Sequence, residues 1–150
     1  MTYDLGRFTA AQDDVYAGVL EELRRGRKTG HWMWFIFPQI AGLGSSATSR
    51  HFAIASLDEA RAYLADPVLG SRLRDCAAQL LALSGRTAEG IFGPVDAKKL
   101  RSSMTLFHRS RPDEALFEKV LARYFADGPD PRTDRLLGGD LRDASVRDIH

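Results

Sequence analysis

The apolar residues of this chain recur at intervals of three and four along most of its length, and this spacing is that of one face of an α-helix. The clearest stripe runs from Leu69 to Leu83. It follows Asp66-Pro67, in which an N-cap residue precedes a proline at the first helical position, where the missing N–H group costs nothing. These signals predict a helix that continues to Ser84 and is closed by Gly85.

Two capping-box patterns predict the starts of further helices. Thr9 is followed three residues later by Gln12, and Ser56 is followed in the same way by Glu59. The first pattern precedes an apolar stripe that predicts one helix over residues 10–25. The second predicts a short helix with its own buried face.

The rest of the chain adds two helices and little evidence for strands. Asp96 is a candidate cap for one helix, and Pro112 opens another that ends near Gly128, while Gly26 is a candidate stop for the first helix. No segment alternates in the manner of a strand between hairpin turns, and a short hairpin around residues 40–55 is the alternative that we keep open. The sequence therefore predicts an all-α fold.

Length and charge narrow the class of protein. A chain of 150 residues is long enough for one compact multihelical domain, which we assign to residues 1–137. Residues 138–150 are rich in glycine and charge, and we expect a loosely held tail there. The net charge of +1 argues against a dedicated nucleic-acid binder. The absence of a long apolar run and of a basic leader argues against membrane insertion and export, and the single cysteine, Cys76, favours the cytoplasm.

Aromatic side chains are concentrated in residues 30–39, which we call the aromatic segment. It holds both tryptophans of the chain and two of the eight phenylalanines. Trp32 and Trp34 would point to opposite sides of a strand, or lie about 200° apart on a helix. One ring is therefore expected to face inward and the other to line a groove.

Two interpretations of the aromatic segment remain open. It is either a buried central segment whose rings bring large apolar area to the core, or an aromatic wall for a planar ligand such as a base or a nicotinamide ring. In the second case Lys28, His31, Gln39 and Arg50 would supply the polar contacts. The loop Gly42–Ser46 resembles a phosphate-binding loop loosely, since its exposed amides could bind an anion.

A second concentration of polar residues follows Asp96. On a helix, Lys98, Ser102 and Thr105 share one face, and Lys99 aligns with Ser103. A lysine one turn from a serine resembles the pair of Ser–Lys hydrolases, in which a desolvated lysine acts as the base. The alternative is an exposed helix start with solvated lysines.

The four histidines and Cys76 are not spaced as metal ligands are. We therefore predict neither a metal site nor a cofactor. Residues 130–133 read as a turn, whose Asp130 and Thr133 could close over a site formed by the other segments.

Several short sequence segments of this chain together resemble a known family. They are Phe8-x-x-Ala11-Gln12, Gly26-Arg27-Lys28, His31-Trp32-Met33-Trp34-Phe35-Ile36-Phe37-Pro38-Gln39, Gly42-Leu43-Gly44, Ile91-Phe92-Gly93 and Ser102-Ser103-Met104-Thr105-Leu106-Phe107. The chain resembles, over most of residues 8–133, the uncharacterised bacterial family called domain of unknown function 1810. The resemblance implies a compact multihelical domain and no established activity. Members are sometimes labelled calpastatin, a label that suits a long disordered inhibitor and not a short globular chain.

These observations favour a pocket that binds a small anionic, ring-bearing metabolite of the nucleotide or ADP-ribose class. If turnover occurs, we expect hydrolysis without a metal, with His31 or Lys99 assisting proton transfer. The expected ligand-binding residues are Lys28, Trp32, Trp34, Gln39, Ser46, Arg50, Lys98, Ser102, Ser103, Asp130 and Thr133. The alternative is a non-catalytic interaction module whose aromatic surface docks a protein partner.

Overall fold

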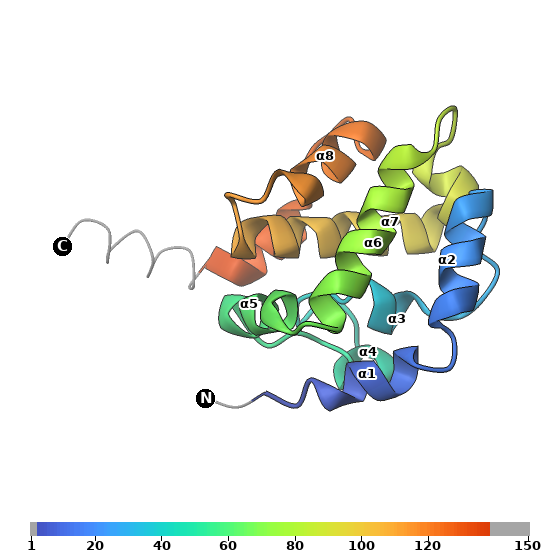
Figure 1. Ribbon diagram of the computed structural model, residues 1–150. Helices are drawn as coiled ribbons and strands as arrows, with labels where there is room; N and C mark the ends of the chain where they lie inside the picture. Colours follow the sequence, from blue (N-terminus) through green and yellow to red (C-terminus); the bar gives the residue numbers. More distant parts are fainter. Residues whose placement is uncertain (1–2, 139–150) are drawn as a thin grey trace.

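Helix α7 (Ala88–Ser110) runs through the centre of the molecule, and other helices pack against it, as the computed structural model in Figure 1 shows. The structure describes residues 3–138. Helix α8 (Ala115–Tyr124) covers one side of α7, while α5 (Leu57–Ala65) and the single turn α3 (Met33–Ile36) lie on another. The aromatic segment is therefore placed against the central helix.

The remaining helices form an outer layer. Helix α6 (Leu69–Ala82) crosses in front of α7 and packs against α2 (Tyr16–Arg25), α5 and α8. Helix α1 (Gly6–Gln12) packs on α3, and α4 (Ala47–His51) is a short helix nearby. A last helix covers residues 131–138.

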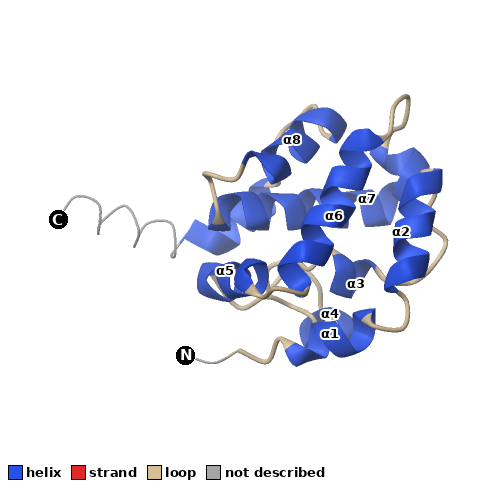
Figure 2. Ribbon diagram, viewed as in Figure 1, coloured by secondary structure: helices blue, strands red, loops and turns tan. Residues whose placement is uncertain are grey.

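The prediction of an all-α single domain is confirmed. Throughout residues 3–138 the chain forms helices and loops only (Figure 2). Instead of the hairpin considered for residues 40–55, Ile40 and Ile54 form one isolated parallel bridge. No helix in this described part of the chain has the length and apolar content that crossing a bilayer requires.

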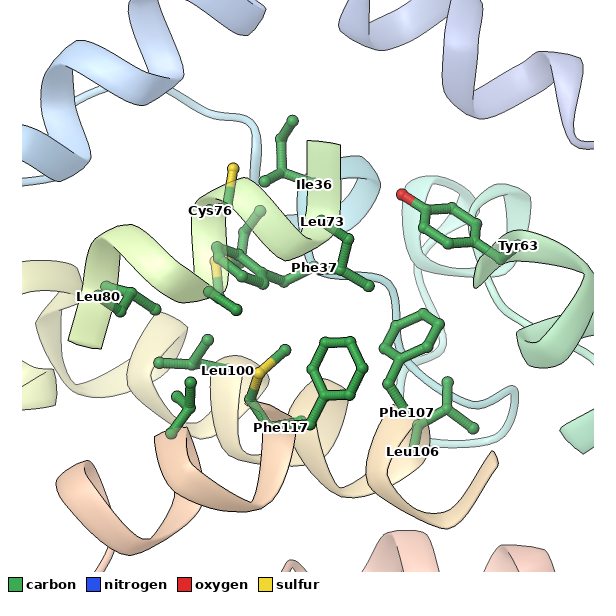
Figure 3. Close-up of a cluster of buried hydrophobic side chains, with 14 of the residues drawn as sticks. Ile36, Phe37, Tyr63, Leu73, Cys76, Leu80, Leu100, Leu106, Phe107 and Phe117 are labelled. Carbon is green, nitrogen blue, oxygen red and sulfur yellow. The ribbon is translucent and has the colours of Figure 1, made fainter. Parts of the chain in front are cut away.

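The hydrophobic core lies between α5, α6, α7, α8 and the aromatic segment (Figure 3). Its centre is a row of rings in which Phe107 contacts Tyr63 and Phe117, with centroid distances of 5.4 and 5.8 Å. Phe37 and Cys76 are fully buried in the same cluster. Burial raises the pKa of the Cys76 thiol to about 12, so this cysteine is a small apolar core residue.

Several predicted helix ends are confirmed by their hydrogen bonds. The Ser56 hydroxyl accepts from the Glu59 amide at 3.2 Å at the start of α5. The Asp66 carboxylate accepts from the Leu69 amide at 3.0 Å, although α6 begins at Leu69 with Val68 as its N-cap, two residues later than predicted. Gly26 ends α2 in the left-handed region, with φ of 73°.

The prediction of one helix over residues 10–25 is wrong, because the chain turns between α1 and α2. Thr9 lies inside α1 and does not cap a helix. Gln12 is buried, and its amide donates to the Phe35 carbonyl at 2.7 Å and to the Tyr63 hydroxyl at 3.0 Å. These long-range bonds take the place of the expected capping box.

Three further helix boundaries need correction. Helix α6 ends at Ala82 and not at Ser84. Helix α7 consists of two helical pieces joined at a kink, since Gly93 has a non-helical φ of 81°, and the second piece begins at Pro94, two residues before the predicted cap Asp96. Residues 131–138 form a helix and not a turn. The predicted tail, apart from residue 138, lies outside the described residues.

Candidate functional site

Segments that are far apart in sequence line one cavity of about 460 Å³. One wall comes from residues 34–53, which include the end of the aromatic segment and α4; another comes from α7, and helix 131–138 contributes one side chain. Among the described residues, seven of the predicted site residues line this cavity: Trp34, Gln39, Ser46, Arg50, Lys98, Lys99 and Ser102.

The aromatic segment is core on one side and cavity wall on the other. Trp32 is only 3% exposed, and its ring packs on Phe37 and Phe92 at centroid distances of 6.2 and 6.3 Å. Its indole N–H donates to the Glu22 carboxylate at 3.2 Å. Trp34 is half-buried and lines the cavity. The two open interpretations of the segment therefore each describe one of its tryptophans.

Lys99 links the wall of the cavity to a partly buried ion-pair cluster. Its Nζ lies 4.0 Å from the centroid of the Trp34 ring and 3.2 Å from Asp96 Oδ1. The other oxygen of Asp96 accepts from Lys28 Nζ at 2.8 Å. Burial raises the pKa of Asp96, but the hydrogen bonds from Lys28 and Lys99 outweigh it and hold this pKa below its ordinary value. Lys99 therefore makes an ion pair with Asp96 and a cation–π contact with Trp34.

Lys28 itself is absent from the residues that line the cavity and lies behind them. Besides Asp96, its Nζ donates to the Gly30 carbonyl at 2.5 Å and lies 5.1 Å from the Trp32 ring centroid. It therefore supports the site through Asp96 and does not reach a ligand in this arrangement.

His31 lies in a different place from Lys99. It is exposed and lines, with Trp32, a separate cavity of about 290 Å³ beside Asp14 and Glu22. The structure therefore places the two alternative candidates for proton transfer, His31 and Lys99, at different cavities.

Ser103 also lies apart from the main cavity. It is fully buried, and within residues 3–138 its hydroxyl has no hydrogen-bond partner. The sequence placed it beside Lys99 on one face of the helix, but its side chain is part of the core.

Asp130 and Thr133 fix the start of helix 131–138 to α7, behind the residues that line the cavity. The Asp130 carboxylate accepts from the hydroxyls of Ser102 at 2.9 Å and Thr133 at 2.6 Å, and the Asp130 amide donates to the Thr105 hydroxyl at 2.9 Å. Burial raises the pKa of Asp130, and these hydroxyl bonds, with the amides of helix 131–138, outweigh it and lower this pKa. Neither residue lines the cavity.

Arg132 lines the cavity and was missed by sequence reasoning. It lies between the two residues expected to close over the site, and Asp130-Pro131 is the same N-cap signature as Asp66-Pro67. That signature predicts a helix start, and with it the exposure of Arg132 on the first turn.

The cavity wall is cationic. Within the described part of the chain, its lining includes Arg50, Lys98, Lys99 and Arg132 and no aspartate or glutamate. The serine hydroxyls of the same wall and the backbone of Gly42–Ser46 add neutral hydrogen-bonding groups. Nowhere in residues 3–138 do three or more His, Cys, Asp or Glu side chains gather as they would to hold a metal ion. This arrangement suits an anion that also carries a flat apolar surface.

An all-α domain with a cationic, tryptophan-walled cavity is the class of protein that the fold and the site define. The chain belongs to the family described as Protein of unknown function (DUF1810), whose model matches residues 2–137. It is also similar to the conserved hypothetical protein Rv1873 from Mycobacterium tuberculosis, whose crystal structure was determined at 1.38 Å. The two chains share 51% identity and a TM-score of 0.89 over 91% of this chain and 97% of the other. No curated protein matches the sequence.

Proposed function

We propose that the cavity binds a small anionic metabolite that carries a ring, of the nucleotide or ADP-ribose class. The observation that carries this proposal is that Trp34 and four cationic side chains line one cavity from which, among the described residues, carboxylates are absent. A volume of about 460 Å³ lies within the range of small-molecule sites. The single cysteine of the chain is typical of a cytoplasmic protein, so we expect the ligand to be a metabolite of the cytoplasm.

The lining residues divide into two chemical roles. Trp34 offers its ring for stacking, and Gln39 offers an amide that both donates and accepts hydrogen bonds to the edge of a base. Lys98, Lys99 and Arg50 offer the positive charge, and Lys99 already occupies a position over the Trp34 ring. A ligand with a ring and an anionic group would satisfy both roles at once.

Two other functions are supported less well. Hydrolysis with His31 or Lys99 assisting proton transfer is one of them, because His31 lines a separate cavity and Lys99 is held by Asp96 and the Trp34 ring. A docking surface for a protein partner requires exposed aromatic residues, whereas the large hydrophobic residues exposed in residues 3–138 are Val15, Val68, Val95 and Leu136. The proposal is therefore binding, without an assigned reaction.

Thermal unfolding in the presence of candidate ligands tests the proposal. AMP, ADP, ADP-ribose and sugar phosphates are added to the wild type and to Trp34→Ala. At a concentration one hundred times Kd, a ligand that binds the folded state adds about 2.7 kcal/mol and raises the midpoint by about 5 °C or more. We expect this rise in the wild type and its loss in Trp34→Ala.

Two control variants complete the experiment. Trp34→Phe keeps a ring and should keep most of the rise, while His31→Ala changes the second cavity and should leave it unchanged. The proposal is wrong if none of the compounds raises the midpoint, or if Trp34→Ala responds like the wild type.

A further inference from the structure

The cavity wall carries positive charge that no carboxylate among its described lining residues balances. Of its four cations, Lys99 has an ion-pair partner in Asp96. Arg50 and Lys98 are exposed and form no ion pair with the part of the chain that the structure describes. Arg132 donates to the Leu43 carbonyl at 3.4 Å, a long contact with a neutral group. Three unpaired charges on one concave wall create a strong local potential for an anion.

The charge and its distribution exceed what one phosphate needs. A phosphate monoester carries a charge of about −1.5 to −2 near neutral pH, which is smaller than the charge of the three unpaired cations. These cations also come from three elements: Arg50 from α4, Lys98 from α7 and Arg132 from helix 131–138. A diphosphate carries further ionised oxygens over a longer span, so it reaches more of these groups.

Arg132 is held in place from both sides by other arginines. After it, Arg109 pairs with Asp134 through two bonds, from Nε to Oδ1 at 2.9 Å and from Nη2 to Oδ2 at 3.0 Å. Before it, Arg101 donates to three carbonyl groups of the loop 127–129. The backbone that presents Arg132 is therefore fixed, while its guanidinium group is exposed and free of carboxylates among the described residues.

Resting on the proposed function, we propose that the ligand of this cavity carries a diphosphate, and that Arg132 is the residue that selects it over a monophosphate. A guanidinium group presents paired N–H donors whose planar geometry matches the oxygens of a phosphate group. Lys98 and Lys99 bind the phosphate nearer the ring, and Arg132 binds the second one. A monophosphate leaves Arg132 without a partner.

Isothermal titration with adenosine, AMP, ADP and inorganic pyrophosphate, without added metal, measures this selection. We expect the wild type to bind ADP at least tenfold more tightly than AMP. In Arg132→Gln the affinity for ADP should fall to that for AMP, while the affinity for AMP stays the same. Arg132→Lys keeps a charge without the paired donors, and we expect an intermediate affinity for ADP.

Arg135→Gln is the matched control, because Arg135 is exposed on the same helix and does not line the cavity. It should retain the preference for ADP, and thermal unfolding of each variant shows that the fold is kept. Equal affinities of the wild type for AMP and ADP would overturn the diphosphate assignment and leave the proposed function standing. A preference for ADP that survives in Arg132→Gln would overturn the role of Arg132. If none of the four compounds binds, both proposals fall together.

Discussion

At the scale of single residues, one carboxylate connects the two tryptophans of the aromatic segment. Asp96 binds Lys28, which lies over Trp32 in the core, and Lys99, which lies over Trp34 in the cavity. Each oxygen of the carboxylate has its own lysine, so the pair of ammonium groups is balanced by a single shared anion and by two aromatic rings. The position of Lys99 at the cavity therefore depends on a residue that does not line it.

Asp96→Asn tests this dependence through stability and pH. The substitution leaves two neighbouring lysines without their anion, and we expect a loss of about 2 kcal/mol at pH 7, between the values for exposed and fully buried pairs. Because the folded state lowers the pKa of Asp96, the ionised carboxylate stabilises it above the unfolded-state value of 3.8. This stabilisation disappears as the pH falls through the lower, folded-state pKa.

Urea unfolding of the wild type and of Asp96→Asn should therefore give a gap that is full at neutral pH and narrows steadily in acid, below the unfolded-state pKa. Asp58→Asn is the control, since Asp58 pairs with Arg61 at an exposed position where its side chain is 77% accessible. That variant should lie within about 0.5 kcal/mol of the wild type. A gap for Asp96→Asn that is the same at every pH would contradict the ionic explanation.

At the scale of helices, local signals predicted the ends that local bonds make. Ser56 caps α5, Asp66 accepts from the amides that lead into α6, and Gly26 ends α2 through its own backbone freedom. Gln12 was assigned to a capping box and instead bonds Phe35 and Tyr63, which are far from it in sequence. No pattern in residues 9–12 contains that information.

The candidate site shows the same division. Trp34 and Lys99 could be chosen from sequence because the chain concentrates rare aromatic and polar residues around them. That they lie 4.0 Å apart depends on how α3 packs on α7, which periodicity does not determine. Arg132 could have been included, since Asp130-Pro131 marks a helix start, but residues 130–133 were interpreted as a turn.

The kink in α7 yields a prediction at this scale. Gly93 has φ of 81° and ψ of 163°, a conformation that residues with a Cβ atom avoid, and it lies where the helix restarts at Pro94. A Cβ atom at Gly93 would meet no atom within 4 Å, so Gly93→Ala tests backbone strain alone. We expect a loss of about 1 to 3 kcal/mol in urea unfolding.

Gly18→Ala is the matched control for this variant. Gly18 lies inside α2, and a Cβ atom there also meets nothing within 4 Å, but its φ is not positive. Alanine should therefore stabilise the protein by about 0.5 to 1 kcal/mol, because it lowers the entropy of the unfolded chain. Opposite signs for the two variants support a required kink, and two stabilising variants would show that α7 can straighten.

At the scale of the whole molecule, the cavity exists because residues 34–53 and the last described helix, residues 131–138, meet over the central helix α7. The wall formed by residues 34–53 belongs to the first half of the domain, and helix 131–138 belongs to its end. Leu136 lies close to Gly42, where a Cβ atom would be 3.1 Å from its Cδ2 atom. The last helix therefore closes the cavity by direct contact with the glycine-containing loop.

Arg109→Met should release that helix without unfolding the rest of the domain. The Arg109–Asp134 pair ties the helix to α7 from outside the hydrophobic core, to which this helix contributes only the side chain of Leu137 among the described residues. Loss of a two-bond, half-exposed ion pair of about 1.4 kcal/mol corresponds to about tenfold faster hydrogen exchange of amides 131–138. Arg111→Met removes an exposed pair with Asp113 just after the end of α7 and should leave the exchange of amides 131–138 unchanged. Because Arg132 moves with the released helix, affinity for ADP should fall in Arg109→Met and not in Arg111→Met.

Faster exchange spread evenly over all helices would instead show that the last helix is part of the cooperative core, and that the cavity opens only when the whole domain unfolds.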